Sequence, residues 1–184
     1  MLKKFLLLLL VLLNFNINYL YANDNTIKKS PQTEVILKLD SISVDKSVKD
    51  KIYMEITEYS NIAKAREYRI PTYPKHWLVK DLPKLKNTVL WQGIVKQSEN
   101  KELIISLVEN DFPPLDSDEP LGSIKLILNN KNNKVNINWD NAGFKEPIQI
   151  QKVTDKQSPN HIKFKMKNKH NEYTIEFLVI INSA

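Results

Sequence analysis

The chain has 184 residues, of which 42% are hydrophobic, a formal net charge of +6 and no cysteine. This length and apolar content suit one domain with a substantial core, and the absence of cysteine excludes disulfide bonds. The charge excess is too mild to indicate nucleic-acid binding.

The first 22 residues have the features of a signal peptide. Two lysines near the start precede an unbroken apolar run over 5–13, and Leu20-Tyr21-Ala22 offers a small-residue cleavage site. The apolar run is shorter than the roughly 20 residues that span a bilayer. We therefore expect cleavage, with an uncleaved anchor as the alternative, and an exported protein that is periplasmic or extracellular. The richness of the chain in Lys, Asn and Ile suggests a bacterial source with an AT-rich genome. Cleavage removes two lysines and leaves a net charge of +4.

A polar, aperiodic segment over 23–33 predicts a short flexible leader, and the folded domain is expected at 34–184. Alternating apolar and polar residues predict strands over 34–44 and 52–57. We expect a single helical turn at Asn61–Arg66.

Three prolines interrupt the region 60–87 and exclude a long helix there. They also restrict nearby strands to sheet edges. Trp77 is expected to pin this loop against the core, with a ligand-binding role as the alternative.

Period-two alternation continues through the rest of the chain and indicates further strands. In the first of them Val89, Trp91, Gly93 and Val95 are assigned to one face. These strands are expected at 89–95, 102–109, 122–128, 135–139, 148–150, 161–169 and 173–181. The pattern predicts an all-β fold, an antiparallel β-sandwich of about eight strands and at most ten.

The loop between 102–109 and 122–128 concentrates carboxylates in a basic chain. Five acids fall within eleven positions with no Lys or Arg among them: Glu109, Asp111, Asp116, Asp118 and Glu119. Such a cluster repels itself unless it faces water or a cation, and Ca²⁺ prefers several oxygen ligands on a flexible loop. We therefore predict a calcium site, in which Asp45, or alternatively Asp50, from a neighbouring loop completes the oxygen shell. The alternative is an ordinary solvated loop.

A second candidate feature is the basic stripe Lys163, Lys165, Lys167 and Lys169, which share one face of a predicted strand. Such a stripe attracts anionic lipid headgroups or acidic glycans by about 1 kcal/mol per lysine near a charged membrane. The alternative is a solvent face that keeps the sheet soluble and discourages edge pairing.

Signals of catalysis are nearly absent. The chain has no cysteine nucleophile, no G-x-S-x-G turn and no H-E-x-x-H helix. Its three glycines cannot form a phosphate-binding loop, and His76, His161 and His170 lack metal-ligand spacing. We expect no enzymatic activity.

The segment LIISLVEND…DEPLGSIKLIL, within residues 102–128, resembles a C2 domain. C2 domains show a strand, an acidic D-x-D loop, further acids and then a hydrophobic-Gly pair that opens the next strand, which Leu121-Gly122 matches. The polar loop 45–50 and the Leu90-Trp91 strand also fit. The chain departs from the family after the first loop, where Lys51-Ile52-Tyr53 replaces the usual S-D-P-Y.

The resemblance implies a binding module that attaches to a membrane surface or an envelope component with the help of calcium or charge. Phe112 and Leu115 at the tip of the acidic loop would then contact lipid. The alternative function is a protein-interaction subunit of an envelope or secretion assembly that uses sheet edges and needs no metal. Neither hypothesis involves nucleic acid.

Overall fold

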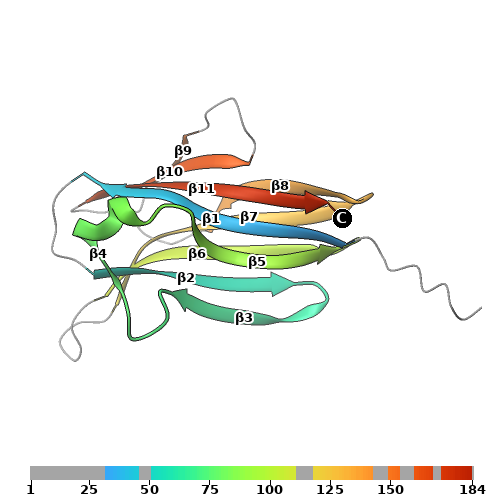
Figure 1. Cartoon of the computed structure of the whole chain (residues 1–184), viewed down its shortest axis with the longest axis horizontal. Helices are drawn as coiled ribbons and strands as arrows, with labels where there is room; N and C mark the ends of the chain where they lie inside the picture. The colour runs from blue at the N-terminus through green and yellow to red at the C-terminus, as the bar shows by residue number, and fades with distance from the viewer. Residues whose placement is uncertain are drawn as a thin grey trace, which may run out of the picture. The chain divides into compact units, whose positions relative to one another are not determined.

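Two antiparallel β-sheets pack face to face in the computed structural model, which describes residues 32–45, 51–110, 118–142, 149–153, 160–167 and 171–183 (Figure 1). One sheet has the strand order β5-β1-β11-β10-β9. Its strands are β5 (Thr88–Lys96), β1 (Gln32–Val44), β11 (Glu172–Ser183), β10 (His161–Lys167) and β9 (Gln149–Val153). The predicted antiparallel β-sandwich is confirmed.

The other sheet has the order β3-β2-β6-β7-β8, with the short strand β4 also paired to β2. Its strands are β3 (Ala63–Ile70), β2 (Lys51–Ser60), β6 (Asn100–Glu109), β7 (Glu119–Lys131), β8 (Lys134–Asn141) and β4 (Trp77–Leu78). The described residues thus form eleven strands, more than predicted. They belong to one unit, Pro31–Ala184.

The core forms because successive side chains of a strand point to opposite faces. In β1, Val35, Leu37 and Leu39 are fully buried, and in β6 Leu103, Ile105 and Leu107 are at most 1% exposed. Aromatic rings of the two sheets pack against each other. The ring centroid of Trp139 in β8 lies 5.6 Å from that of Phe164 in β10 and 5.7 Å from that of Phe177 in β11. These contacts join the inward faces of both sheets.

The helical turn expected at Asn61–Arg66 is wrong. Asn61 and Ile62 form the turn of a hairpin, and β3 begins at Ala63. The first five side chains of β3 are all exposed, so this edge strand shows no alternation of buried and exposed residues that a sequence could record. A six-residue 3₁₀ helix, η1 (Val79–Lys84), follows β4, and Trp77 packs against the core as expected.

The shared face expected for Val89 and Trp91 is also wrong, because β5 contains a register shift. The pairing with β1 jumps from Leu37–Trp91 to Lys38–Val89, which leaves Leu90 as an extra residue. Leu90 and Trp91 are both buried, whereas Val89 is 46% exposed. A bulge of this kind turns a side chain to the other face.

No helix among the described residues is long and apolar enough to cross a membrane.

Replacement of Phe177, which is fully buried between Trp139 and Phe164, tests the packing of the two sheets. We expect Phe177→Ala to lower the free energy of unfolding by about 3–5 kcal/mol, because it removes a large side chain and leaves a cavity. Urea denaturation measures the change. Ile62→Ala, at a position that is 56% exposed, should change it by less than about 0.5 kcal/mol; equal losses would contradict this packing.

Candidate functional site

The structure describes only part of the predicted calcium site. Asp111 and Asp116, with the predicted lipid contacts Phe112 and Leu115, lie outside the described residues. Glu109 ends β6 and pairs across the sheet with Glu119, the first residue of β7. The backbone therefore places these two acids directly opposite each other at the base of the loop.

Asp118 makes hydrogen bonds through both carboxylate oxygens. Its Oδ2 accepts a bond from the Tyr53 hydroxyl at 2.9 Å, and its Oδ1 accepts one from Asn110 Nδ2 at 3.0 Å. Burial and the bond to Asp118 raise the pKa of Tyr53 to about 12, so the phenol stays protonated and keeps donating. Asp118 is thus fixed to the sheet beneath it.

Asp45 joins the end of β1 to the start of β11. Its Oδ1 accepts a hydrogen bond from the Glu172 backbone N–H at 2.8 Å, and its own N–H donates to the Glu172 carbonyl at 3.0 Å. Because β1 and β6 run in the same direction and end beside the starts of β11 and β7 (Figure 1), Asp45 and Glu109 lie at the same end of the sandwich.

Arg69 lies among charged and aromatic side chains on the outer face of the second sheet. The Arg69 guanidinium stacks 3.7 Å from the centre of the Tyr53 ring and donates to the Lys75 carbonyl at 2.7 Å, which holds the loop after β3. Burial and a hydrogen bond with the neighbouring Glu67 carboxyl raise the pKa of Glu55. Arg69 thus holds the loop in place, and the carboxyls of Glu55 on β2 and Glu67 on β3 share a hydrogen bond between adjacent strands.

The basic stripe on β10 is matched by acids on β11. Lys163 pairs with Glu176, and Lys165 lies 2.8 Å from Glu172. Lys167, at the end of the strand, is exposed. Lys169 lies outside the described residues. Because two of the four predicted lysines contact carboxylates, the stripe offers less net positive charge to an anionic surface than its sequence implies.

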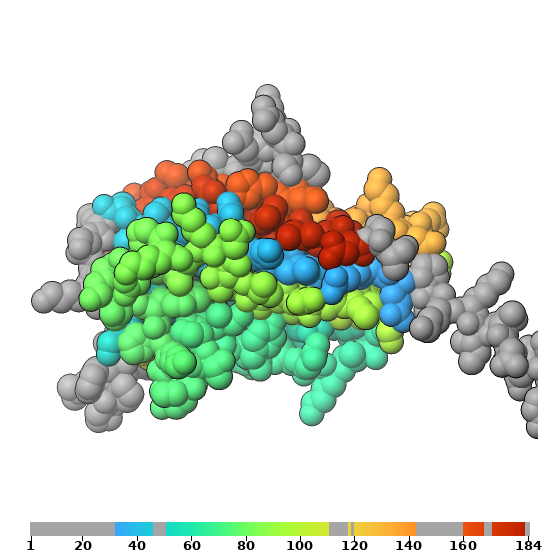
Figure 2. All heavy atoms as spheres, viewed as in Figure 1, coloured from blue at the N-terminus to red at the C-terminus, as the bar shows by residue number. Residues whose placement is uncertain are grey.

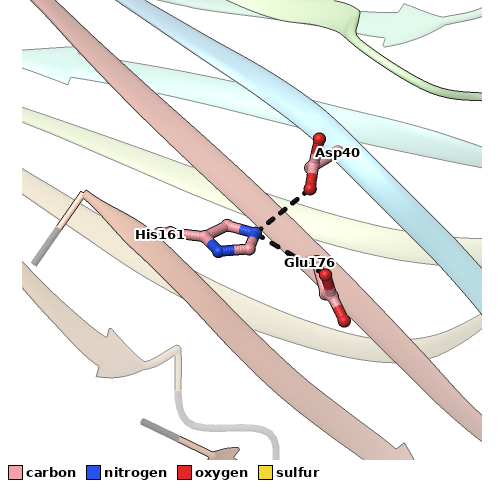
Figure 3. A group of neighbouring side chains, drawn as sticks. All are labelled: Asp40, His161 and Glu176. Atoms are coloured by element: carbon pink, nitrogen blue, oxygen red, sulfur yellow. Dashed lines mark hydrogen bonds and ion pairs between the residues drawn. The ribbon is translucent and has the colours of Figure 1, made fainter. Parts of the chain in front are cut away.

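A cluster that the sequence did not reveal lies on the same face. His161 Nε2 is 3.1 Å from Asp40 Oδ2 and 3.6 Å from Glu176 Oε2 (Figure 3). One ligand atom from each of the three side chains lies within 4.8 Å of the others. The side chains are 40%, 35% and 20% exposed for His161, Asp40 and Glu176, so they are accessible from water.

Three neighbouring strands supply this cluster. In the β10–β11 hairpin Lys163 stands opposite Glu176, which makes His161 a diagonal neighbour of that acid. In β1 the pairing with β11 jumps from Leu39–Phe177 to Ser41–Glu176, so Asp40 is the extra residue of a bulge. The bulge directs Asp40 outward beside Glu176. The hairpin pairing was accessible from the short gap between the predicted strands 161–169 and 173–181, whereas the bulge has no sequence signal.

An open groove of about 420 Å³ lies between β3 and β5, the edge strands of the two sheets. It is lined by Glu58, Arg66, Glu67, Tyr68, Trp91 and Gln92. The Tyr68 hydroxyl crosses it and donates to the Leu90 carbonyl at 3.1 Å. This bond joins the two edges without a continuous ladder between them.

Glu58 forms the floor of the groove at an inward position of β2. Its Oε2 accepts bonds from Trp91 Nε1 at 3.0 Å and Arg66 at 2.8 Å, and its Oε1 accepts one from Lys101 Nζ at 2.9 Å. Burial alone would raise the pKa of Glu58, but the donors Trp91 and Lys101 outweigh it and lower that pKa. Glu58 is therefore ionised and fully bonded, which suits a structural role.

No family model matches the chain, and no curated protein matches it.

Removal of the Lys101 ammonium tests the buried network. Lys101 bonds Glu58 and lies 3.5 Å from Glu99, and both carboxylates are nearly buried. We expect Lys101→Met to lower the free energy of unfolding by about 3–5 kcal/mol at neutral pH, because it leaves buried charge uncompensated. Urea denaturation measures this, and Lys96→Met, at an exposed position, is the control.

The pH dependence of the same variant gives a second readout. The pKa values of Glu58 and Glu99 are both lowered in the folded state, so their stabilising contribution is present above the unfolded pKa and is lost as the pH falls through the folded values. Below about pH 4 the wild type should lose stability steeply and the difference from Lys101→Met should shrink. A difference that stays constant from neutral to acid pH would contradict the role of ionised Glu58 and Glu99.

Proposed function

We propose that this protein is a non-catalytic binding module of the bacterial envelope that holds an extended segment of a partner protein along the free edge of β5. The observation that supports the proposal is the character of this edge. Among the described strands β5 pairs with β1 alone, and its outward residues Val89 and Ile94 are each 46% exposed.

Edge strands invite pairing with another chain because half of their main-chain groups have no partner in the sheet. The described edge strands of the second sheet carry charged or amide side chains that discourage it: β3 exposes Lys64 and Arg66, and β8 exposes Asn136 and Asp140. On β5 the exposed side chains include the apolar Val89 and Ile94, with Gln92 between them bonded to Glu34 of β1 and Lys96 at the end of the strand. An added strand gains main-chain hydrogen bonds and contacts with alternate side chains, and it would replace or pass the Tyr68 hydroxyl that donates to the Leu90 carbonyl.

The groove beside β5 gives such a segment a place to lie. Its two walls are β3 and β5, and its floor is the bonded Glu58–Trp91 pair. Because the floor is fixed by buried hydrogen bonds, little conformational entropy would be lost on binding. The fixed groove favours recognition of a protein segment. Attachment to lipid through β10 is less favoured, because Lys163 and Lys165 pair with Glu176 and Glu172.

A photo-crosslinking experiment tests the β5 edge. A photoreactive phenylalanine analogue placed at Gln92 should form a covalent adduct with an envelope protein of the producing bacterium, and the same analogue at Asn136 on β8 should not. Val89→Lys with Ile94→Lys should lower the adduct yield at least about tenfold, since truncated or charged anchor positions at an interface cost more than about 1.4 kcal/mol.

Ile62→Lys is the matched control, because Ile62 is also an exposed isoleucine but lies in the β2–β3 turn. It should leave the adduct yield unchanged. Equal adducts at Gln92 and Asn136, or none at Gln92, would rule out β5 as the binding edge.

A second candidate function is the C2-like one, calcium-assisted attachment through the acidic loop. It is favoured by the paired Glu109 and Glu119 at the loop base and by Asp118, which Tyr53 and Asn110 hold in place. Phe112 and Leu115 would face the lipid in this arrangement.

Calorimetric titration with calcium tests this candidate. Wild-type protein should release or absorb heat on binding, with a dissociation constant on the order of 0.1–1 mM, as in extracellular calcium modules. Asp111→Asn combined with Asp116→Asn should abolish the signal, while Asp140→Asn on β8 should preserve it. Absence of any signal with the wild type would remove calcium from the function.

A further inference from the structure

We propose that Asp40, His161 and Glu176 bind a divalent transition-metal ion, of which Zn²⁺ is the best representative, on the outer face of the β5-β1-β11-β10-β9 sheet (Figure 3). The ligand atoms are Asp40 Oδ2, His161 Nε2 and Glu176 Oε2. This site shares no residue with the β5 edge or with the acidic loop, so it stands or falls independently of both.

The spacing of the ligand atoms suits a metal with short bonds. In a tetrahedral zinc site with bonds of about 2.0–2.1 Å, neighbouring ligand atoms are about 3.4 Å apart. The observed separations from His161 Nε2, 3.1 Å to Asp40 and 3.6 Å to Glu176, fall on either side of this value. Small side-chain rotations would therefore bring the three atoms around one ion.

The chemistry of the ligands selects the class of metal. An imidazole nitrogen is a good ligand for Zn²⁺ and its first-row neighbours, whereas Ca²⁺ and Mg²⁺ prefer oxygen alone. Two carboxylates beside the imidazole supply the negative charge that a divalent ion needs. The site is thus expected to discriminate against calcium, unlike the acidic loop.

The sheet holds the ligands in position before any ion arrives. Glu176 uses its Oε1 for Lys163, which leaves Oε2 facing the imidazole, and such an outer hydrogen-bonding partner is a common support for a metal ligand. The bulge in β1 adds Asp40 at the point where a regular strand would offer a single outward side chain. Backbone pairing over three strands fixes the backbone positions from which the three ligands extend.

The partial exposure of the cluster allows an ion to enter and leaves room for a further ligand. The three side chains are 20–40% exposed, and three protein ligands leave the fourth tetrahedral position for water. The competing explanation is a simple ion pair, in which a protonated imidazole itself neutralises the two carboxylates. The two explanations differ in whether the variants change metal affinity.

Isothermal titration calorimetry of the untagged chain with zinc chloride and calcium chloride tests the proposal. We expect one zinc equivalent per chain to bind, and His161→Gln to weaken zinc binding by about 100-fold or more, since even the loss of an outer partner costs 10–100-fold. Asp40→Asn and Glu176→Gln should each weaken it by at least about tenfold. Calcium should give no change that depends on His161.

His76→Gln is the matched control, because His76 lies on the loop before β4 away from the cluster. Zinc should raise the thermal midpoint of the wild type and of His76→Gln but not that of His161→Gln, which also shows that each variant folds. Wild-type protein that binds no zinc, or His161→Gln that binds it as tightly as the wild type, would overturn the proposal.

Discussion

The burial of one apolar face by each sheet is the constraint on which the rest of this structure depends. It fixes the parity of the strands that bury an apolar face, and a slip of one residue in such a strand would reverse all its side chains. In β1 both Leu39 and Ile42 are buried, although they are three residues apart and a regular strand would place them on opposite faces. The bulge between them keeps both in the core and leaves Asp40 and Ser41 outside. The outward Asp40 of the histidine cluster is therefore a consequence of core packing.

Polar residues replace apolar ones on the inward rows at one end of the sandwich. Glu58, Lys101, Asn130 and Thr33 occupy inward positions of β2, β6, β7 and β1, and each is at most 7% exposed. A buried ion pair adds little net stability because desolvation offsets its attraction. Its hydrogen bonds are directional, however, and Trp91 Nε1 on Glu58 links β5 to the opposite sheet. This end layer thereby sets the separation of β3 and β5 and keeps the groove between them open.

Most strands could be predicted because alternation over several residues reports burial directly, as Ile162, Phe164 and Met166 do in β10. Prediction from the sequence failed where buried and exposed residues do not alternate regularly along a strand. The exposed residues of β3 carry no pattern, and the extra Leu90 of β5 reverses the face of Val89. The histidine cluster escaped prediction for a different reason. Asp40 and His161 are 121 positions apart, and their contact requires both the β1–β11 pairing and a bulge that depends on tertiary packing.

The β5 edge and the histidine cluster belong to the same sheet, and their separation determines whether they influence each other. Atoms of β1 and β11 occupy the surface between β5 and β10 (Figure 2), and Lys38 of β1 stands opposite both Val89 and Leu178. Since strands are about 4.8 Å apart, His161 on β10 lies three spacings, or about 14 Å, from β5. His161 is therefore out of reach of a segment confined to the edge, whereas Asp40 on β1 and Glu176 on β11 lie one and two spacings from β5. A partner that also covers Ile36 and Ile180, the outward pair between them, would approach the open coordination position, and the two affinities would then be linked by equal factors.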